Sequence, residues 1–283
     1  MVGGAFDVIL GRRLEELEPL EYLPTKREAG ACALEAGLLR NAVRGEELPI
    51  LLLRPPDHRD GKFLIWIDRR GKQGLLKPDG EPRDGVARAL EAGLTVVGVD
   101  LFEQGEFLRP GRTLFESARL VVRGNGSQPW ERAPAFTFGY NYPLFSQRTH
   151  DILSVIRALS DPPFSAVSIS LAGLGPTTGP LVAAALAQSS GAVARAAIDT
   201  RGFRFSELSR VDHPMFLPGA AKYGDLPGLL SLSSARELWL AGEGREAPPA
   251  VEAVVRWSHD TISLTLSSDD SLEKAVAWLV RTR

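Results

Sequence analysis

Short apolar runs alternate with segments of helical periodicity along most of the chain. Near-continuous apolar runs of strand length lie at 48–54, 62–68, 94–100, 167–171, 195–200, 237–242 and 261–266. Helical patterns lie at 83–93, 145–159 and 271–282. A further helical pattern follows the run at 167–171, and another begins at 247–250. Buried strands that alternate with helices are typical of a parallel sheet covered on both faces. We therefore expect an α/β protein with a mostly parallel sheet of about eight strands and helices on both faces.

The two ends of this pattern differ from its middle. Residues 5–20 alternate apolar and charged groups with helical spacing, so residues 1–30 are predicted to be an amphipathic entry segment. The extended runs 31–39 and 48–54 flank a polar turn and predict an antiparallel hairpin at one edge of the sheet. Residues 103–143 and 201–225 lack clear periodicity. We expect the second of these excursions to lie over the carboxyl edge of the sheet, within a single domain of residues 1–283.

Composition narrows the class of protein. The 283 residues are 44% hydrophobic and 24% charged, with a formal net charge of −2, which does not favour a nucleic-acid partner. A single cysteine, Cys32, excludes an intrachain disulfide or a cysteine metal cluster. The amino terminus does not have the pattern of a signal peptide, and the sequence contains no apolar run of about 18 residues. We expect no membrane association and a cytoplasmic protein, or a secreted or periplasmic one if the chain is cut from a longer precursor.

The segment 165–190 contains a strand pattern, a tight turn and a helix pattern in immediate succession. The turn reads Gly173-Leu174-Gly175-Pro176-Thr177. This order of elements resembles the α/β-hydrolase fold over almost the whole chain, and in that fold such a junction carries the nucleophile elbow G-x-S-x-G. The strings FGYNYPLFSQRTHD (138–151) and DHPMFLPGAAKYGDLPGLL (212–230) are similar to acetylxylan-esterase-like hydrolases of bacterial polysaccharide utilisation, some of which carry two such domains in tandem.

The resemblance implies a catalytic apparatus that this sequence does not supply in the expected places. The nucleophile position holds Gly175, which has no side chain, and the next residue is Pro176, which has no N–H for an oxyanion hole. A histidine would be expected at 267–270, where the sequence reads Ser-Ser-Asp-Asp, and His259 precedes the last strand. The acid that follows the strand at 237–242 could be Glu243 or Glu246. The elbow is therefore interpreted as degenerate.

A shifted register offers another set of catalytic candidates. Residues 175–179 read G-x-T-x-G, which makes Thr177 a candidate nucleophile, although a threonine at a helix start also caps the helix. His213, in the excursion 201–225, could act as a base with Glu243 as its acid, or could make only a local hydrogen bond. In this register Thr178 would supply the N–H of the oxyanion hole. The residues expected to form an oxyanion hole or pocket are Arg70, Gly71, Gly175, Pro176 and Thr178.

Acidic residues also follow four of the predicted strands: Asp68, Asp100, Asp199 and Glu243. Ligands of open α/β sheets bind at the carboxyl edge, so these acids could hold a cation or perform acid–base chemistry on a sugar. Alternatively, they cap the following helices or pair with Arg69, Arg70 and Arg201. Because no histidine has a partner at metal-ligand spacing, neither metal ligands nor a cofactor are assigned.

These observations favour a non-catalytic or accessory module of an esterase system, which binds a carbohydrate or small ester in the crevice or supports a second hydrolase domain or a homo-oligomer. The alternative is an active carboxylic-ester hydrolase that acts on acetylated carbohydrates or small esters through a non-standard nucleophile such as Thr177. A metal-assisted hydrolase built on the strand-end acids is a third hypothesis. Whether the chain is an enzyme stays open at this point.

Overall fold

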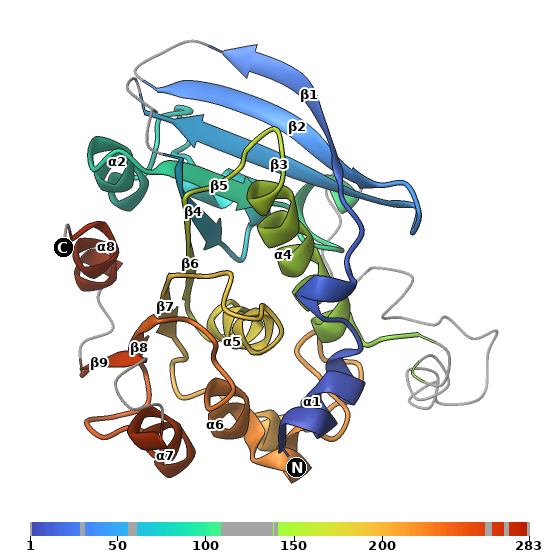
Figure 1. Cartoon of the computed structure of the whole chain (residues 1–283), viewed down its shortest axis with the longest axis vertical. Coiled ribbons are helices and arrows are strands. Elements are labelled where there is room, and N and C mark those ends of the chain that lie inside the picture. The colour runs from blue at the N-terminus through green and yellow to red at the C-terminus, as the bar shows by residue number, and fades with distance from the viewer. Residues whose placement is uncertain are drawn as a thin grey trace.

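The computed structural model describes residues 2–28, 32–55, 61–108, 138, 141–257, 262–268 and 272–281. In this part of the chain nine strands form one sheet in the order β1-β2-β3-β5-β4-β6-β7-β8-β9 (Figure 1). Their bounds are β1 Glu21–Glu28, β2 Ala33–Asn41, β3 Glu46–Arg54, β4 Lys62–Ile67, β5 Thr95–Val99, β6 Ser168–Leu174, β7 Arg195–Asp199, β8 Glu237–Ala241 and β9 Ser263–Ser267. The expected α/β sheet is thus confirmed, with one strand more than the expected eight.

The sheet is antiparallel at one end and parallel through its centre. Strands β1, β2, β3 and β5 pair antiparallel in that order, whereas β5, β4, β6, β7, β8 and β9 pair parallel. Strand β4 follows β3 in the sequence, but β5 lies between these two strands in the sheet. The parallel part therefore extends from β4 in both directions, to β5 on one side and to β6 on the other. Because parallel strands point the same way, the loops after β4, β6, β7 and β8 all meet at one edge.

The first thirty residues differ from the expectation of one amphipathic entry segment. Helix α1 spans only Val2–Leu10, and β1 follows as the edge strand of the sheet. The hairpin of β2 and β3 is confirmed, but it lies inside this edge rather than at it. Strand β1 carries Pro24 and a bulge between Pro24 and Lys26, so it lacks the alternation that marks a strand in sequence. Strand β1 is recognised as a strand only by its hydrogen-bonded pairing with β2.

Helices cover both faces of the sheet, as the alternation of the pattern predicts. The remaining helices are α2 Asp84–Glu91, α4 Leu144–Ser160, α5 Gly179–Ala187, α6 Asp225–Leu230, α7 Pro249–Trp257 and α8 Leu272–Val280. Leu64 and Trp66 of β4 point to the core under α2 and α8, while Phe63, Ile65 and Ile67 point to the core under α1, α4, α5 and α6. Figure 1 shows these two groups of helices on opposite sides of the strands.

Two glycines set the close approach between α5 and the central strands. A Cβ atom on Gly173 would lie 2.5 Å from Val182 Cγ2 and 2.6 Å from the carbonyl oxygen of Thr178. A Cβ atom on Gly179 would lie 2.3 Å from the carbonyl oxygen of Asp199. All three distances are far below van der Waals contact, so only glycine fits at either position. The start of α5 is therefore held against the ends of β6 and β7.

The excursions are described only in part. Residues 109–137, 139 and 140, most of the first excursion, lie outside the described residues, as do His58, His259 and the loop 269–271 after β9. The second excursion contains two short 3₁₀ turns, Phe205–Glu207 and Ala220–Tyr223, before α6 begins. Every helix in the described part of the chain is too short or too polar to span a lipid bilayer.

Helix α4 carries two adjacent ionisable side chains, the buried His150 and the partly buried Asp151. His150 Nε2 lies 2.6 Å from the carbonyl oxygen of Leu10, so this nitrogen carries the ring proton. Burial lowers the pKa of His150 from 6.5 to about 4. The Asp151 carboxyl accepts the N–H of Phe102 at 2.7 Å, and burial raises its pKa from 3.8 to about 7. Between these two pKa values, both side chains are therefore held largely uncharged in the core.

Replacing Asp151 by asparagine should alter the pH dependence of stability. The folded chain keeps the Asp151 proton up to about pH 7, whereas the unfolded chain loses it near pH 3.8, so the parent loses stability as the pH rises through this window. Asp151→Asn stays neutral and can still accept the Phe102 N–H. Relative to the parent, its free energy of unfolding should rise with pH by up to ~4 kcal/mol.

Urea unfolding of the parent and Asp151→Asn at about pH 4.5 and about pH 7.5 measures this difference. The contribution of His150, which weakens stability as the pH falls from 6.5 towards about 4, is common to both proteins. A stability difference that stays constant across the window would contradict the buried neutral carboxyl.

A second substitution tests the packing of α5 on the sheet. Gly179→Ala should lower the free energy of unfolding by about 1–3 kcal/mol, because the new methyl group meets the Asp199 carbonyl oxygen and the backbone must move. Gly4→Ala in α1 is the matched control, since a Cβ atom there meets nothing within 4 Å and helix propensity predicts a gain of about 0.5–1 kcal/mol. Equal effects of the two substitutions in urea unfolding would be inconsistent with this packing.

Candidate functional site

The turn between β6 and α5 has a defined hydrogen-bond pattern. Gly175 adopts a φ of +141°, which favours glycine, and its N–H donates to the carbonyl oxygen of Asp199 at 2.9 Å. The N–H groups of Thr178 and Gly179 donate to the carbonyl oxygen of Gly175 at 3.2 and 2.8 Å. Pro176 has no N–H. Within the described residues the N–H of Thr177 has no partner, so it is the backbone donor of this turn that stays available.

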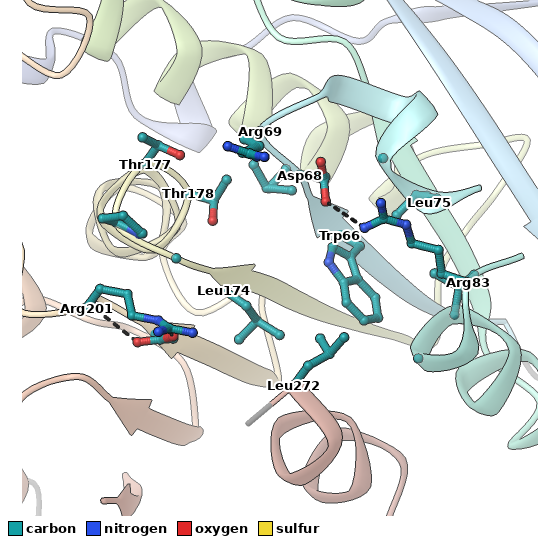
Figure 2. Close-up of a pocket in the computed structure, with 17 residues that line it drawn as sticks. Trp66, Asp68, Arg69, Leu75, Arg83, Leu174, Thr177, Thr178, Arg201 and Leu272 are labelled. Carbon is teal, nitrogen blue, oxygen red and sulfur yellow. Dashed lines mark hydrogen bonds and ion pairs between the residues drawn. The ribbon is translucent and has the colours of Figure 1, made fainter. Parts of the chain in front are cut away.

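A cavity of about 650 Å³ opens beside this turn, at the carboxyl ends of β4, β6 and β7. Its walls come from the turn itself, from the loop after β4, from the start of α2 and from the first residue of α8 (Figure 2). Trp66, Leu174 and Leu272 form an apolar side, and the other side is polar. The expected placement of a ligand crevice at the carboxyl edge is thus matched by a cavity of a size suited to a small molecule.

Three arginines and two aspartates line the polar side of the cavity: Arg69, Arg83, Arg201, Asp68 and Asp199. Arg201 Nε lies 2.8 Å from Asp199 Oδ2, and the Arg201 backbone N–H donates to Asp199 Oδ1 at 3.0 Å. Asp68 Oδ1 accepts the N–H of Arg70 at 2.8 Å. Arg83 Nη1 lies 4.0 Å from Asp68 Oδ2. Both aspartates therefore have cationic or N–H partners from the protein.

Thr178 lies directly before α5 and faces the cavity. The residue is only 3% exposed, and its Oγ1 has no hydrogen-bond partner within the described residues. It makes no capping hydrogen bond to the first turn of α5. Thr177 is exposed at the mouth of the cavity. Within the described residues the Thr177 hydroxyl makes no hydrogen bond to the first turn of α5. The geometry therefore does not support Thr177 as a helix cap.

The structure brings together some of the residues singled out in the sequence and separates others. Six of them line the cavity: Asp68, Gly175, Pro176, Thr177, Thr178 and Asp199. Among the described residues that line it, Arg70, Gly71, Asp100, His213 and Glu243 do not appear. Arg70 instead donates from Nη2 to the carbonyl oxygen of Gly74 at 3.4 Å. The neighbouring Arg69 takes the place at the cavity that was expected for Arg70.

Asp100 is fully buried behind this loop and fixes it. Its Oδ1 accepts the N–H of Lys72 at 2.9 Å, its Oδ2 accepts the N–H of Glu106 at 3.1 Å, and the Lys72 ammonium pairs with the same carboxylate. A Cβ atom on Gly71 would lie 2.1 Å from Asp100 Oδ1, so glycine is required there. Asp100 and Gly71 therefore shape the loop after β4 from behind.

Glu243, the expected acid of a triad, is bound to an arginine. Arg204 donates to it with both terminal nitrogens, at 3.0 Å to Oε1 and 2.6 Å to Oε2, and the Thr200 hydroxyl donates to Oε1 at 2.5 Å. The Glu243 side chain is only 1% exposed. This carboxylate raises the pKa of the Arg204 guanidinium through the hydrogen bonds and its charge. This pair of hydrogen bonds between Arg204 and Glu243, the Glu243–Arg204 fork, connects the loop after β8 to the excursion that follows β7.

His213, the expected base, makes a local contact. The N–H of Met215 donates to His213 Nδ1 at 3.1 Å, and partial burial lowers the pKa of this histidine. His150 is a buried residue of α4, and the remaining two histidines fall outside the described residues. Within the described part, the residues that line the cavity include no serine, cysteine or histidine.

The described residues also bear on the metal hypothesis. They contain no group of three histidine, cysteine, aspartate or glutamate side chains arranged to hold a metal ion. Each strand-end acid instead has a basic neighbour: Asp68 near Arg70 and Arg83, Asp100 with Lys72, Asp199 with Arg201, and Glu243 with Arg204. The pairing interpretation of these acids is therefore the one that the geometry supports.

Several residues of the cavity had no signal in the sequence. Arg83 and Leu272 each stand next to a helix start, far apart in the chain, and only the fold brings them together. Trp66 belongs to an apolar strand, where its position is typical of a core residue. From the sequence, Arg69 is expected only as a possible partner of the strand-end acids. Its place at the cavity could have been found, because the loop after β4 follows a central strand at the carboxyl edge.

The strand order, the parallel centre of the sheet and the strand–turn–helix junction beside a cavity define an α/β-hydrolase fold. Neither protein-family models nor curated proteins match the sequence. The structure is similar to a proposed acetyl xylan esterase from Bacteroides fragilis, with a TM-score of 0.63 and 12% identity over 94% of this chain and 73% of that one.

Two further solved structures are similar to the chain. Acetyl Xylan Esterase 1 from Thermoanaerobacterium sp. gives a TM-score of 0.56 at 15% identity, over 93% of this chain and 85% of the esterase. A glucuronoyl esterase from Solibacter usitatus gives 0.58 at 12% identity, over 96% and 90%. These likenesses confirm the fold expected from the sequence, which this chain shares with carbohydrate esterases.

The Glu243–Arg204 fork leads to a prediction for stability. Glu243→Gln should lower the free energy of unfolding by about 2–4 kcal/mol, because it leaves the Arg204 guanidinium without its charged partner in a largely buried site. Glu252→Gln is the matched control: it breaks the exposed pair with Arg256 on α7 and should cost less than about 1 kcal/mol. Chemical unfolding of both variants measures the two effects, and equal losses would show that the fork has no special role.

Proposed function

We propose that the chain is a non-catalytic, ligand-binding module that retains the crevice of an α/β-hydrolase esterase without its nucleophile. The observation that carries this proposal is Gly175, which occupies the turn after β6 where esterases of this fold present the attacking hydroxyl. A Cβ atom on Gly175 would meet only Thr178 Oγ1, at 3.8 Å. There is room at this position for a side chain that the sequence does not provide.

The neighbouring residue adds a second, independent argument. In α/β-hydrolases the residue after the nucleophile donates its N–H to the developing oxyanion, and loss of one such donor costs about 10²–10³ in kcat. Pro176 has no N–H to donate. Two groups required for acyl transfer are therefore missing at adjacent positions, whereas the cavity beside them is retained.

The cavity supports a binding role. It offers an apolar side, guanidinium groups and an unpaired hydroxyl, which are the components of a small-molecule site. Since the solved structures with this fold include acetyl xylan esterases and glucuronoyl esterases, we propose a carbohydrate or small ester as the ligand. A role as the supporting partner of a second hydrolase domain is compatible with the same site.

Thr177 supports the competing hypothesis of an active hydrolase. It is exposed at the mouth of the cavity, and it lies one position before Thr178 at the start of α5. A hydroxyl there would still need a general base to accept its proton. The described residues that line the cavity provide only Asp68 and Asp199 as bases, and both already accept hydrogen bonds from the protein.

Hydrolysis of p-nitrophenyl acetate by the parent, Thr177→Ala and Gly175→Ser tests the proposal. We expect no turnover above the spontaneous rate from the parent or from Thr177→Ala, because a positioned nucleophile and oxyanion donor are lacking. Acetylated xylo-oligosaccharides should nevertheless raise the melting temperature of the parent, since a ligand that binds only the folded state stabilises it.

The Gly175→Ser variant tests the position of the lost nucleophile directly. It introduces a hydroxyl into open space next to the cavity, but the positive φ strains a serine and Pro176 still provides no donor. It should therefore gain at most weak activity. Turnover by the parent that disappears in Thr177→Ala would overturn the proposal and establish the displaced nucleophile.

A further inference from the structure

The charges around the cavity do not balance. Its lining holds three arginines against two aspartates. Arg201 and Asp199 neutralise each other at 2.8 Å. Asp68 has two guanidinium neighbours, Arg70 Nε at 3.8 Å and Arg83 Nη1 at 4.0 Å, and it also accepts the N–H of Arg70 at 2.8 Å. The charge of Arg69 is not neutralised by a neighbouring carboxylate, since the described residues provide this side chain with no hydrogen bond or ion pair. A cavity with low-dielectric walls concentrates the field of such a charge.

The polar groups that lack partners lie around the same space. Thr178 Oγ1 is buried and has no hydrogen-bond partner within the described residues, and the N–H of Thr177 is likewise without one. Figure 2 shows the Thr178 hydroxyl directed from the start of α5 into the cavity, with Arg69 on the same polar side. All three groups can donate to an oxygen, and the amino-terminal end of α5 adds a positive dipole.

The opposite side of the cavity is apolar. Trp66, Leu174 and Leu272 face the polar groups across the space in Figure 2. A free inorganic anion would leave these side chains against water or against a charge, whereas the carbon skeleton of an organic acid would cover them. The two sides together suit a ligand with one acidic end and one apolar or ring-shaped part.

We infer that the ligand of the cavity is an organic acid whose carboxylate is held by Arg69, Thr178 Oγ1 and the Thr177 N–H. This inference rests on the proposed binding function and names the chemical class of its ligand. A carboxylate has two acceptor oxygens, which match the fork of a guanidinium and leave lone pairs for the hydroxyl and the backbone donor. Arg83 is positioned to balance Asp68 and to keep that carboxylate from repelling the ligand.

Two pairs of probes test the inference by titration calorimetry at neutral pH: galacturonate against galactose, and benzoate against benzyl alcohol. Each pair shares a ring and differs in the carboxylate. We expect at least one acid to bind about tenfold or more tightly than its neutral counterpart. Inorganic phosphate, which has charge without a carbon skeleton, should bind more weakly than that acid.

Three variants identify the groups that hold the acid. Arg69→Gln should weaken its binding about tenfold, Arg69→Lys less because the charge stays, and Thr178→Val about fivefold through loss of the hydroxyl. Arg256→Gln is the matched control: it removes the same charge from an exposed side chain on α7 and should leave the affinity unchanged. Circular dichroism and melting temperatures establish that the variants are folded.

The outcomes separate this inference from the function on which it rests. The inference is wrong if neither acid binds better than its neutral counterpart up to about 20 mM, a concentration at which even millimolar affinity would be seen. It is also wrong if acid binding is as strong in Arg69→Gln as in Arg256→Gln. Neutral acetylated oligosaccharides that bind as tightly as the acids, and independently of Arg69, would overturn the inference and leave the binding module. Thr177-dependent ester turnover would overturn the binding module itself.

Discussion

The approach of α5 to the ends of β6 and β7 is the constraint on which the crevice depends. Gly173 and Gly179 allow backbone atoms of the helix and the strands to meet where any side chain would collide. With both ends of the turn held in this way, residues 175–178 have little freedom, and the N–H groups of Gly175 and Thr178 donate to backbone carbonyl oxygens. The site is therefore formed by backbone packing, and its side chains are placed on that frame.

The charged groups at the carboxyl edge fall into two sets with different roles. Asp100 with Lys72, and Glu243 with Arg204, are buried pairs that tie loops to the sheet behind and beside the cavity. The arginines that face the cavity, by contrast, are more exposed, and Arg69 has no partner among the described residues. A protein that loses one buried partner loses loop geometry, whereas a change at an exposed group such as Arg69 alters what the cavity attracts.

Periodicity was sufficient to predict the α/β class, the hairpin of β2 and β3, and the strand–turn–helix junction, because those segments bury apolar residues with a regular spacing. Periodicity did not predict β1, because this edge strand contains a proline and a bulge and is recognised only by its pairing with β2. Within the site, Asp68 and Asp199 were found because an acid after a parallel strand lies at the shared edge. The sequence could not show that Arg69 rather than Arg70 lines the cavity, because adjacent residues in a turn point in different directions. Nor could it show that Glu243 lies away from the cavity, because its partner Arg204 is distant in the sequence.

The bulged edge strand β1 also bears on how copies of the chain can meet. An exposed sheet edge with free N–H and C=O groups invites another strand to pair with it. Pro24 removes one donor from β1, the bulge after it breaks the spacing of the rest, and the strand sequence EYLPTKRE places charges of both signs along it. Continuous sheet extension through β1 is thereby disfavoured, so copies of the chain that meet at this end of the sheet would have to use helix and loop surfaces instead.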